Sequence, residues 1–308
     1  MPASAAQSAI RPPTTLVARW GAALFTVAVI GAIAVVFGRS AGELARWQWR
    51  VEPVRLAASF LLVVLSYPMF ALAWRQSLIA SGGELAGRPA LRIFATSQLA
   101  RYLPGSVWNF VGRTVLCVGH GVGRAAAAGS VVLEHTASIA CALLVFLASL
   151  PLWPGRIAPS FRPVIAMTAL AAVLMLHPTV FARLLRVAAR VMRSEVPSGD
   201  FSTRRLAIAA AHFIAAWIVL GLGFWAFATA VQPLPLQSVP VLAGGFPLAW
   251  VIGFVTLFAP SGLGIREAVA TALLAVFVPV SVAGVIAVAF RLFQVLAELA
   301  WAAVASRL

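Results

Sequence analysis

Ionised side chains interrupt several long apolar stretches of this 308-residue chain. Three of them, Glu134, Arg291 and Glu298, lie well inside apolar runs, and Arg113 and Arg266 follow closely after Pro/Gly breaks. A charge in apolar surroundings is strongly unfavourable unless it is paired or hydrated. These residues therefore predict either ion pairs that hold helices together or a wet, polar pocket that several of them share.

Two segments combine a Pro/Gly break with a following arginine. Residues 101–113 read RYLPGSVWNFVGR, and residues 260–267 read PSGLGIRE. A break of this kind frees backbone N–H groups at a helix N-terminus, where anions bind favourably. The planar fork of arginine matches phosphate and carboxylate groups. Paired interrupted segments in the two halves of a chain are the best sequence indication of a transport site.

The composition places the chain in a membrane. Hydrophobic residues make up 62% of it and charged residues 10%, whereas soluble proteins carry about 25% charged residues. The net charge is +15, but the arginines are spread beside apolar runs and form no basic domain of their own. This pattern favours anionic lipid headgroups over nucleic acid as the partner. The two cysteines, Cys117 and Cys141, have no metal-binding spacing, so we expect no metal and no cofactor.

The apolar runs predict an all-α integral membrane protein with about eight transmembrane helices in one polytopic domain, residues 1–308. Each run is close to the ~20 residues that cross a bilayer. The predicted spans are 20–37, 57–79, 128–150, 163–182, 205–230, 238–258, 264–281 and 282–305. Two glycine pairs within these runs, Gly221 with Gly223 and Gly244 with Gly245, are predicted positions of helix contact or kinking.

Three further segments are too polar or too broken to cross lipid alone. Residues 91–118 and 259–270 contain the two Pro/Gly breaks, and we expect broken or re-entrant helices there, in a pseudo-repeat arrangement. Residues 38–56 mix arginines with Trp47 and Trp49, as is typical of a helix lying at the membrane surface.

Arginine-rich loops predict the orientation. The richest cluster, within residues 183–205, should face the cytoplasm, and residues 231–237, which have no arginine, should lie outside. Counting back through the spans places the N-terminal tail, residues 1–19, in the cytoplasm. The arginines of residues 39–55 would then lie outside, against the rule.

If the charged groups share a pocket, Arg113 and Arg266 are expected to contact a headgroup phosphate, with Glu134 and Glu298 balancing their charge. Arg291 would pair with Glu298 or Glu267. His135 could join the pocket or relay protons, and a plain helix-packing role is its alternative. The candidate substrate-binding residues are Arg101, Trp108, Asn109, Arg113, Glu134, His135, Arg266, Glu267, Arg291 and Glu298.

In these segments the chain resembles the lysylphosphatidylglycerol synthase transmembrane region family, over roughly residues 20–305. The resemblance lies in Arg101 with Pro104-Gly105, Trp108, Gly112-Arg113, Glu134 and residues 260–267. It implies a polytopic protein of the bacterial inner membrane. In the best-known members this domain moves aminoacylated phosphatidylglycerol between leaflets, and related members accompany lipid-linked sugar metabolism.

The chain departs from that family in two ways. No soluble aminoacyl-transfer domain follows within these 308 residues, so we expect that the chain does not make lysylphosphatidylglycerol by itself. After Glu134 the sequence continues His-Thr-Ala-Ser, without the charged residues that often follow in the family, which leaves the headgroup open.

We therefore expect a flippase-like protein, not an enzyme, that translocates a phosphate-bearing lipid such as a phospholipid or a lipid-linked sugar. A membrane glycosyltransferase or lipid-modifying enzyme is one alternative, and a scaffold or membrane subunit for such an enzyme is another. Membrane lipids are the expected partners. A separate synthase or glycosyltransferase and a second copy of the chain are the protein partners left open.

Overall fold

The structure is a computed structural model that describes residues 40–102, 108–155, 202–256 and 262–308 continuously, with a few single positions between them. These residues form helices joined by short turns, and no strand occurs among them. The α-helices are α2 (Ala41–Arg46), α3 (Pro53–Ala80), α4 (Gly87–Leu99), α5 (Trp108–Gly119), α6 (Arg124–Ser149), α9 (Thr203–Val231), α10 (Ser238–Val255), α11 (Ile265–Leu274) and α12 (Val280–Ala305). Two 3-10 turns, η1 (Ala100–Tyr102) and η2 (Leu150–Leu152), follow α4 and α6.

Five of these helices are long and apolar enough to cross a membrane. They are α3, α6 with η2, α9, α10 and α12, with 28, 29, 29, 18 and 26 residues. Since an α-helix rises 1.5 Å per residue, about 20 residues cover the hydrocarbon core. The all-helical membrane architecture predicted from the apolar runs is confirmed at these five places.

One predicted span is wrong. Residues 264–281 form only the ten-residue helix α11, followed by turns that lead into α12. Ten helical residues cover about 15 Å, half of the hydrocarbon thickness. The apolar composition of this stretch reflects burial among other helices, because Leu273 and Leu274 are buried inside the protein. The predicted spans 20–37 and 163–182 and the tail 1–19 lie outside the continuously described residues.

The predicted surface segment, residues 38–56, divides into two parts. Its first part contains the short helix α2, and its last residues begin α3 at Pro53. The Nε1 of Trp47 donates a hydrogen bond to Oε1 of Gln232 at 3.1 Å, and Ser281 donates to Oε2 of Glu43 at 2.6 Å. These bonds tie α2 to the end of α9 and the start of α12.

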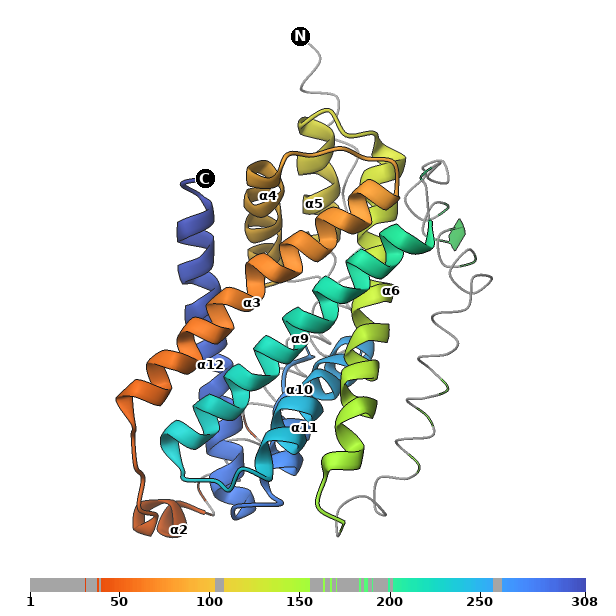
Figure 1. Cartoon of the computed structure of the whole chain (residues 1–308). Coiled ribbons are helices and arrows are strands. Elements are labelled where there is room, and N and C mark those ends of the chain that lie inside the picture. The colour runs from red at the N-terminus through yellow and green to blue at the C-terminus, as the bar shows by residue number, and fades with distance from the viewer. Residues whose placement is uncertain are drawn as a thin grey trace.

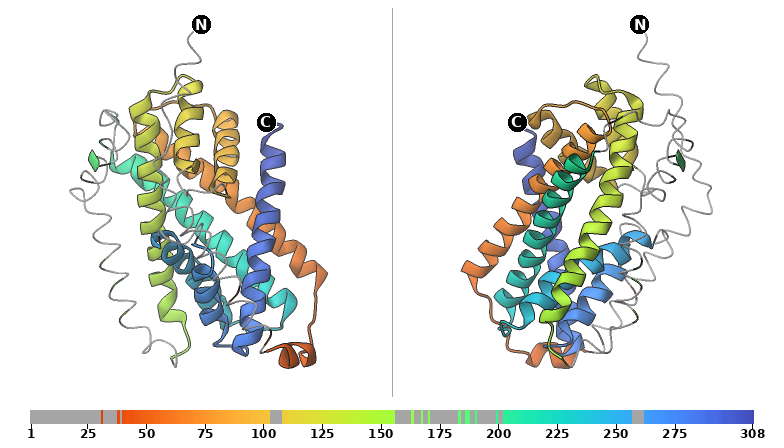
Figure 2. Two further views of the ribbon diagram at one scale, coloured as in Figure 1. Left: turned by 180° about the vertical axis from the view of Figure 1, so that it is seen from behind. Right: turned by 45° about the vertical axis from the view of Figure 1, so that its right-hand side comes forward.

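Helices α3 and α9 run side by side across one face of the molecule (Figures 1 and 2). They approach closely because Gly223 has no side chain: a β-carbon there would lie 2.8 Å from Cγ2 of Val63. The Oγ of Ser59 donates to the Gly223 carbonyl oxygen at 2.8 Å. The predicted contact role of this glycine is confirmed. Behind the pair, an aromatic cluster fills the core between α9, α10 and α12: Phe224, Phe227, Phe246, Phe290 and Phe293.

The two broken segments form helical hairpins that start from opposite ends of the molecule. The open end of the α4–α5 hairpin lies at the same end as the C-terminus, whereas α10 begins and α11 leads into α12 near α2 (Figure 1). Residues flanking both breaks, Arg101 and Asn109 in the first hairpin and Thr256 and Gly262 in the second, line one cavity. The residues that flank the two breaks therefore come together inside the protein. Their tips, residues 103–107 and 257–261, lie outside the described residues.

Candidate functional site

A cavity of about 160 Å³ lies where the two hairpins meet, and it has room for several water molecules. Every α-helix of the described residues except α2 contributes to its wall. Six of the ten predicted site residues line it: Arg101, Asn109, Glu134, His135, Arg266 and Arg291. The other four, Trp108, Arg113, Glu267 and Glu298, are not part of the wall.

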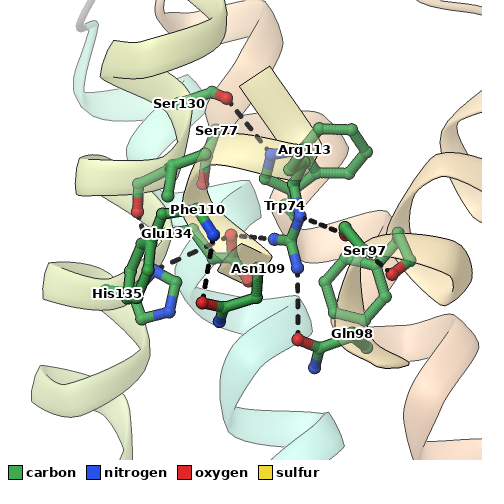
Figure 3. Close-up of polar contacts among 12 residues, drawn as sticks. Trp74, Ser77, Ser97, Gln98, Asn109, Phe110, Arg113, Ser130, Glu134 and His135 are labelled. Atoms are coloured by element: carbon green, nitrogen blue, oxygen red, sulfur yellow. Dashed lines mark hydrogen bonds and ion pairs between the residues drawn. The ribbon is translucent and has the colours of Figure 1, made fainter. Parts of the chain in front are cut away.

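Arg113 lies behind this wall, at the junction of α4, α5 and α6. Its guanidinium forms an ion pair with the carboxylate of Glu134, its Nε donates to Oγ of Ser97 at 2.9 Å, and a terminal nitrogen donates to Oε1 of Gln98 at 3.3 Å (Figure 3). Only 1% of the residue is exposed. Each of the three guanidinium nitrogens therefore has an acceptor, as burial of a charge requires.

Aromatic rings enclose the same guanidinium. Its carbon lies 4.3 Å from the ring centre of Phe94 and 5.1 Å from that of Trp74, within the range of cation–π attraction. The Nε1 of Trp74 in turn donates to Oγ of Ser130 at 3.1 Å, which joins α3 to α6. Arg113 was predicted to contact a phosphate, but its burial assigns it to holding Glu134 and the first hairpin in place.

A row of planar groups crosses the cavity wall from one hairpin to the other. The ring centres of Phe110 and His135 are 4.6 Å apart, those of His135 and Phe254 5.3 Å, and those of Phe254 and Trp250 5.1 Å. The guanidinium of Arg266 lies 5.2 Å from the ring centre of Trp250. The row therefore connects α5 through α6 to α10 and α11, and it holds Arg266 at its far end.

His135 is the middle of this row and also part of the cavity wall. Its Nδ1 lies 2.8 Å from the carbonyl oxygen of Val131 and 3.9 Å from Oε2 of Glu134. The two roles predicted for this residue, pocket member and packing residue, are therefore compatible in space. The ring lies between Phe110 of one hairpin and Phe254 of the other, and it also forms part of the cavity wall.

Helix α12 contacts both hairpins through one polar face. The Nε of Arg291 lies 3.6 Å from Oε1 of Glu267 in the second hairpin, and Glu298 forms an ion pair with Arg101 beside the first break. Gln294, between them at helical spacing, lines the cavity. Of the two partners predicted for Arg291, the structure selects Glu267, and Glu298 pairs with Arg101 instead.

Glu267 also closes the start of α11. Its Oε2 accepts a hydrogen bond from the backbone N–H of Gly264 at 2.6 Å, and Gly264 adopts a positive φ of 85° that favours glycine. This carboxylate therefore occupies one of the N–H groups that the sequence offered to an external anion. The arginine fork of this hairpin is therefore a better candidate for anion binding than the helix terminus alone.

Glycine sets the position of Arg266. A β-carbon at Gly253 would lie 2.3 Å from Cγ of Arg266, so the arginine stem passes directly over the glycine. Gly262, with φ of 67°, approaches the same turn of α10 so closely that a β-carbon there would lie 2.7 Å from the Gly253 carbonyl oxygen. The close packing directs the guanidinium onto Trp250 and toward the cavity.

The wall also contains residues that the sequence analysis did not name. They are mainly aromatic and uncharged polar side chains, among them Tyr67, Gln98, Ser138, Trp217, Trp250, Phe254, Thr256 and Gln294. Two spacings could have indicated some of them. Trp250 and Phe254 are four residues apart on one helix face, and Gln294 shares a face with Arg291 and Glu298. Aromatic residues on other helices gave no local signal.

The comparison with protein families matches residues 20–302 to the family described as Lysylphosphatidylglycerol synthase TM region. No curated protein and no solved structure matched the chain. The family resemblance carried by the two break motifs is thus confirmed over nearly the whole chain.

Proposed function

Since the chain belongs to the lysylphosphatidylglycerol synthase TM region family and is a multi-pass integral membrane protein, we propose that it translocates a phosphate-bearing lipid between leaflets. The observation that carries the proposal is the convergence of Arg101, Arg266 and Arg291 on one cavity between two helical hairpins. Arginine forks in a low-dielectric cavity bind phosphate oxygens by charge-assisted hydrogen bonds. Such a cavity can shelter a headgroup while the acyl chains stay in lipid.

Arg266 is the residue to which we assign the main phosphate contact. It lines the cavity at the end of the aromatic row, where stacking on Trp250 restricts its orientation. Arg101 and Arg291 reach the same cavity but also form ion pairs with Glu298 and Glu267. A phosphate would therefore compete with these carboxylates for Arg101 and Arg291. Arg266 lines the same cavity and would bind the phosphate beside them.

We propose that the α4–α5 and α10–α11 hairpins are the re-entrant elements of the membrane domain. They begin at opposite ends of the molecule and meet at the cavity, the arrangement from which alternating access is built in transporters with inverted repeats (Figure 2). The Arg101–Glu298 and Arg291–Glu267 pairs join each hairpin to α12. Movement of one hairpin against the other would require at least one of these pairs to open.

The distribution of arginines supports one orientation. One end of the molecule contains the first residues of α4, α6 and α9 and also the C-terminus (Figure 1). The arginines of these segments are Arg88, Arg92, Arg124, Arg204, Arg205 and Arg307. The other end carries Arg46, Arg50 and Arg55. By the positive-inside rule we assign the first end to the cytoplasm of a bacterial inner membrane, with the N-terminus on the same side.

The proposal involves binding and movement of the lipid without covalent chemistry. A separate synthase or glycosyltransferase would then supply or consume the lipid, and a second copy of the chain could be a further partner. If the chain instead serves as a membrane scaffold for such an enzyme, it should co-purify with that enzyme and move no lipid alone.

Leaflet accessibility in proteoliposomes tests this function. The purified chain is reconstituted with a fluorescent anionic phospholipid, and a membrane-impermeant reductant follows the arrival of inner-leaflet lipid at the outer leaflet. We expect faster transfer than in protein-free vesicles. Arg266→Gln should slow the transfer by about tenfold or more, because a hydrogen bond to a charged group contributes roughly 1.5–3 kcal/mol.

The matched control is Arg55→Gln, since Arg55 is half-exposed and pairs with Glu52 far from the cavity along α3. This variant should transfer lipid at the wild-type rate. Transfer no faster than in empty vesicles would contradict translocation itself. Equal rates for wild type and Arg266→Gln would contradict only the role assigned to Arg266.

A further inference from the structure

The charges around the cavity do not cancel. Four arginines and three glutamates make up the described charged cluster: Arg101, Arg113, Arg266, Arg291, Glu134, Glu267 and Glu298. The one other acidic residue in the sequence from α3 to α6 is Glu84, which is exposed in the turn between α3 and α4, and the sequence from α9 to α12 contains no further one. With His135 neutral, the cluster carries one surplus positive charge. A surplus charge in apolar surroundings is unfavourable, and a ligand of opposite charge relieves it.

On the basis of the proposed function, we infer that the lipid taken by this cavity carries a headgroup with one net negative charge. It is a single phosphodiester whose other polar groups are hydroxyls, and it has no ammonium group. A zwitterionic headgroup would leave the surplus charge uncompensated, and a cationic headgroup would double it. The inference therefore separates this chain's ligand from aminoacylated, positively charged lipids.

The carboxylates of the cluster support this choice. Glu134 is the one carboxylate among the described residues of the wall, and it is paired with the buried guanidinium of Arg113. Glu267 and Glu298 lie behind the wall and pair with Arg291 and Arg101. A headgroup ammonium would have to take a carboxylate away from an arginine, which would leave a buried guanidinium uncompensated.

The aromatic residues of the planar row do not offer an ammonium cage. Cages of this type surround a cation with open ring faces. Here His135 stacks between two phenylalanine rings, and Trp250 stacks on Phe254 and carries the guanidinium of Arg266. These faces are already used for contacts between the hairpins. Arg266 is itself the cation that Trp250 binds.

Neutral polar groups in the wall suit hydroxyls. Gln98 and Asn109 line the cavity, and their amide oxygens accept hydrogen bonds from Arg113 and from the backbone N–H of Phe110. Their amide nitrogens, which only donate, are then the ends that can meet a ligand. Donors bind hydroxyl and phosphate oxygens but not ammonium groups. A hydroxylated headgroup therefore matches both the charge and the hydrogen bonding of the wall.

Binding of short-chain phospholipids to the purified full chain in neutral detergent tests the inference. The probes are dihexanoyl phosphatidylglycerol, phosphatidylcholine and lysylphosphatidylglycerol, with net charges of about −1, 0 and +1 at neutral pH, and inorganic phosphate. We expect phosphatidylglycerol to bind at least about tenfold more tightly than each of the other probes. Equal or tighter binding of either other lipid overturns the inference, as does the absence of lipid binding. Equal binding of inorganic phosphate would make this a free-phosphate site and also overturns it.

Two variants test the charge argument directly. Gln294→Glu adds a carboxylate to the wall at nearly constant volume and cancels the surplus, so the preference for phosphatidylglycerol over phosphatidylcholine should fall to about one. Arg266→Lys keeps the charge and should keep the preference even if its affinity is lower. A tenfold preference that persists in Gln294→Glu would overturn the inference, and so would its loss in Arg266→Lys while that variant remains folded.

The leaflet assay with the same three headgroups separates this inference from the proposed function. Equal transfer of all three lipids would leave translocation standing and overturn the headgroup assignment. Tenfold selective binding without transfer between leaflets would support the headgroup assignment and contradict translocation.

Discussion

The two hairpins share a sequence pattern, a Pro/Gly break followed by an arginine, yet they are held in the protein by different forces. The first hairpin is fixed by charge: Arg113 is enclosed by Glu134, Ser97 and Gln98, and Arg101 beside the break pairs with Glu298. A β-carbon at Gly112, directly before Arg113, would have no neighbour within 4 Å, so no close glycine packing occurs at that position.

The second hairpin is fixed by close backbone packing. A β-carbon at Gly221 of α9 would lie 2.1 Å from the Ala243 carbonyl oxygen of α10, and one at Gly244 would lie 2.2 Å from Ser149 of α6. A β-carbon at Gly245 would lie 2.8 Å from Leu273 of α11. The predicted contact roles of these three glycines are confirmed. Glycine contacts thus hold this hairpin against α9 and α6, and the Arg291–Glu267 pair joins it to α12.

This difference explains why one arginine faces the cavity and the other does not. In the first hairpin the guanidinium of Arg113 binds Glu134 and the neighbouring polar groups of α4, so this arginine is buried behind the wall. In the second, glycines do the docking, and Arg266 extends over Gly253 to the cavity. The same motif therefore gives a structural arginine in one half and a candidate binding arginine in the other.

The largest effect should come from breaking the ion pair between Arg113 and Glu134 that holds the first hairpin. Arg113→Leu leaves Glu134 buried without its partner and should lower the free energy of unfolding by about 3–5 kcal/mol. Thermal unfolding in detergent measures this as a drop in Tm. The double variant Arg113→Leu with Glu134→Gln should recover much of the loss, because it removes both buried charges.

The control for that prediction is Arg55→Leu, which removes an exposed partner of Glu52. Exposed pairs contribute about 0–1 kcal/mol, so its Tm should stay close to that of wild type. A double variant no more stable than Arg113→Leu alone would show that the buried carboxylate is not the source of the loss.

The glycine contacts that hold the second hairpin should be weakened even by a methyl side chain. Gly221→Ala places a methyl group against a backbone oxygen, which cannot rotate away, and overpacking of this kind costs roughly 1–3 kcal/mol. The matched variant Gly112→Ala meets open space and should leave Tm unchanged or raise it slightly, because alanine favours helix over glycine. If Gly112→Ala lowered Tm as much as Gly221→Ala, the contrast between a hairpin held by charge and a hairpin held by glycine packing would be wrong.

Loss of the ring contacts that connect the two hairpins should lower stability no more than Gly221→Ala does. His135→Ala removes the middle of the planar row and should lose roughly 1–3 kcal/mol, about 0.5–1.5 kcal/mol for each of its two ring contacts. His135→Phe restores a ring and should recover both Tm and the rate of lipid transfer. Transfer that remains low in a stable His135→Phe protein would instead favour a proton-relay role for the imidazole.

Much of the fold follows from the sequence because apolar length and helix breaks are local signals. The five long helices and the glycine contacts are examples. Residues 264–281 show the limit of that signal: an apolar run is the same whether lipid or protein surrounds it, and only the packing of α11 against α10 and α12 distinguishes the two.

The candidate site was predictable in its charged members but not in its pairing. Insertion costs require Glu134, Arg291 and Glu298 to find partners, but the partner of Glu298 is 197 residues away, at Arg101. The planar row was not predictable for the same reason. Phe110, His135 and Phe254 lie on three helices, and their stacking depends on tertiary structure alone.

Binding of a lipid phosphate in the cavity is tested most directly by an experimental structure of the full chain in lipid nanodiscs containing phosphatidylglycerol. We expect a phosphate between the two breaks, within hydrogen-bonding distance of the Arg266 guanidinium, while Arg113 remains paired with Glu134. Lipid phosphates found only at the two aqueous margins, with the cavity closed by side chains, would contradict it.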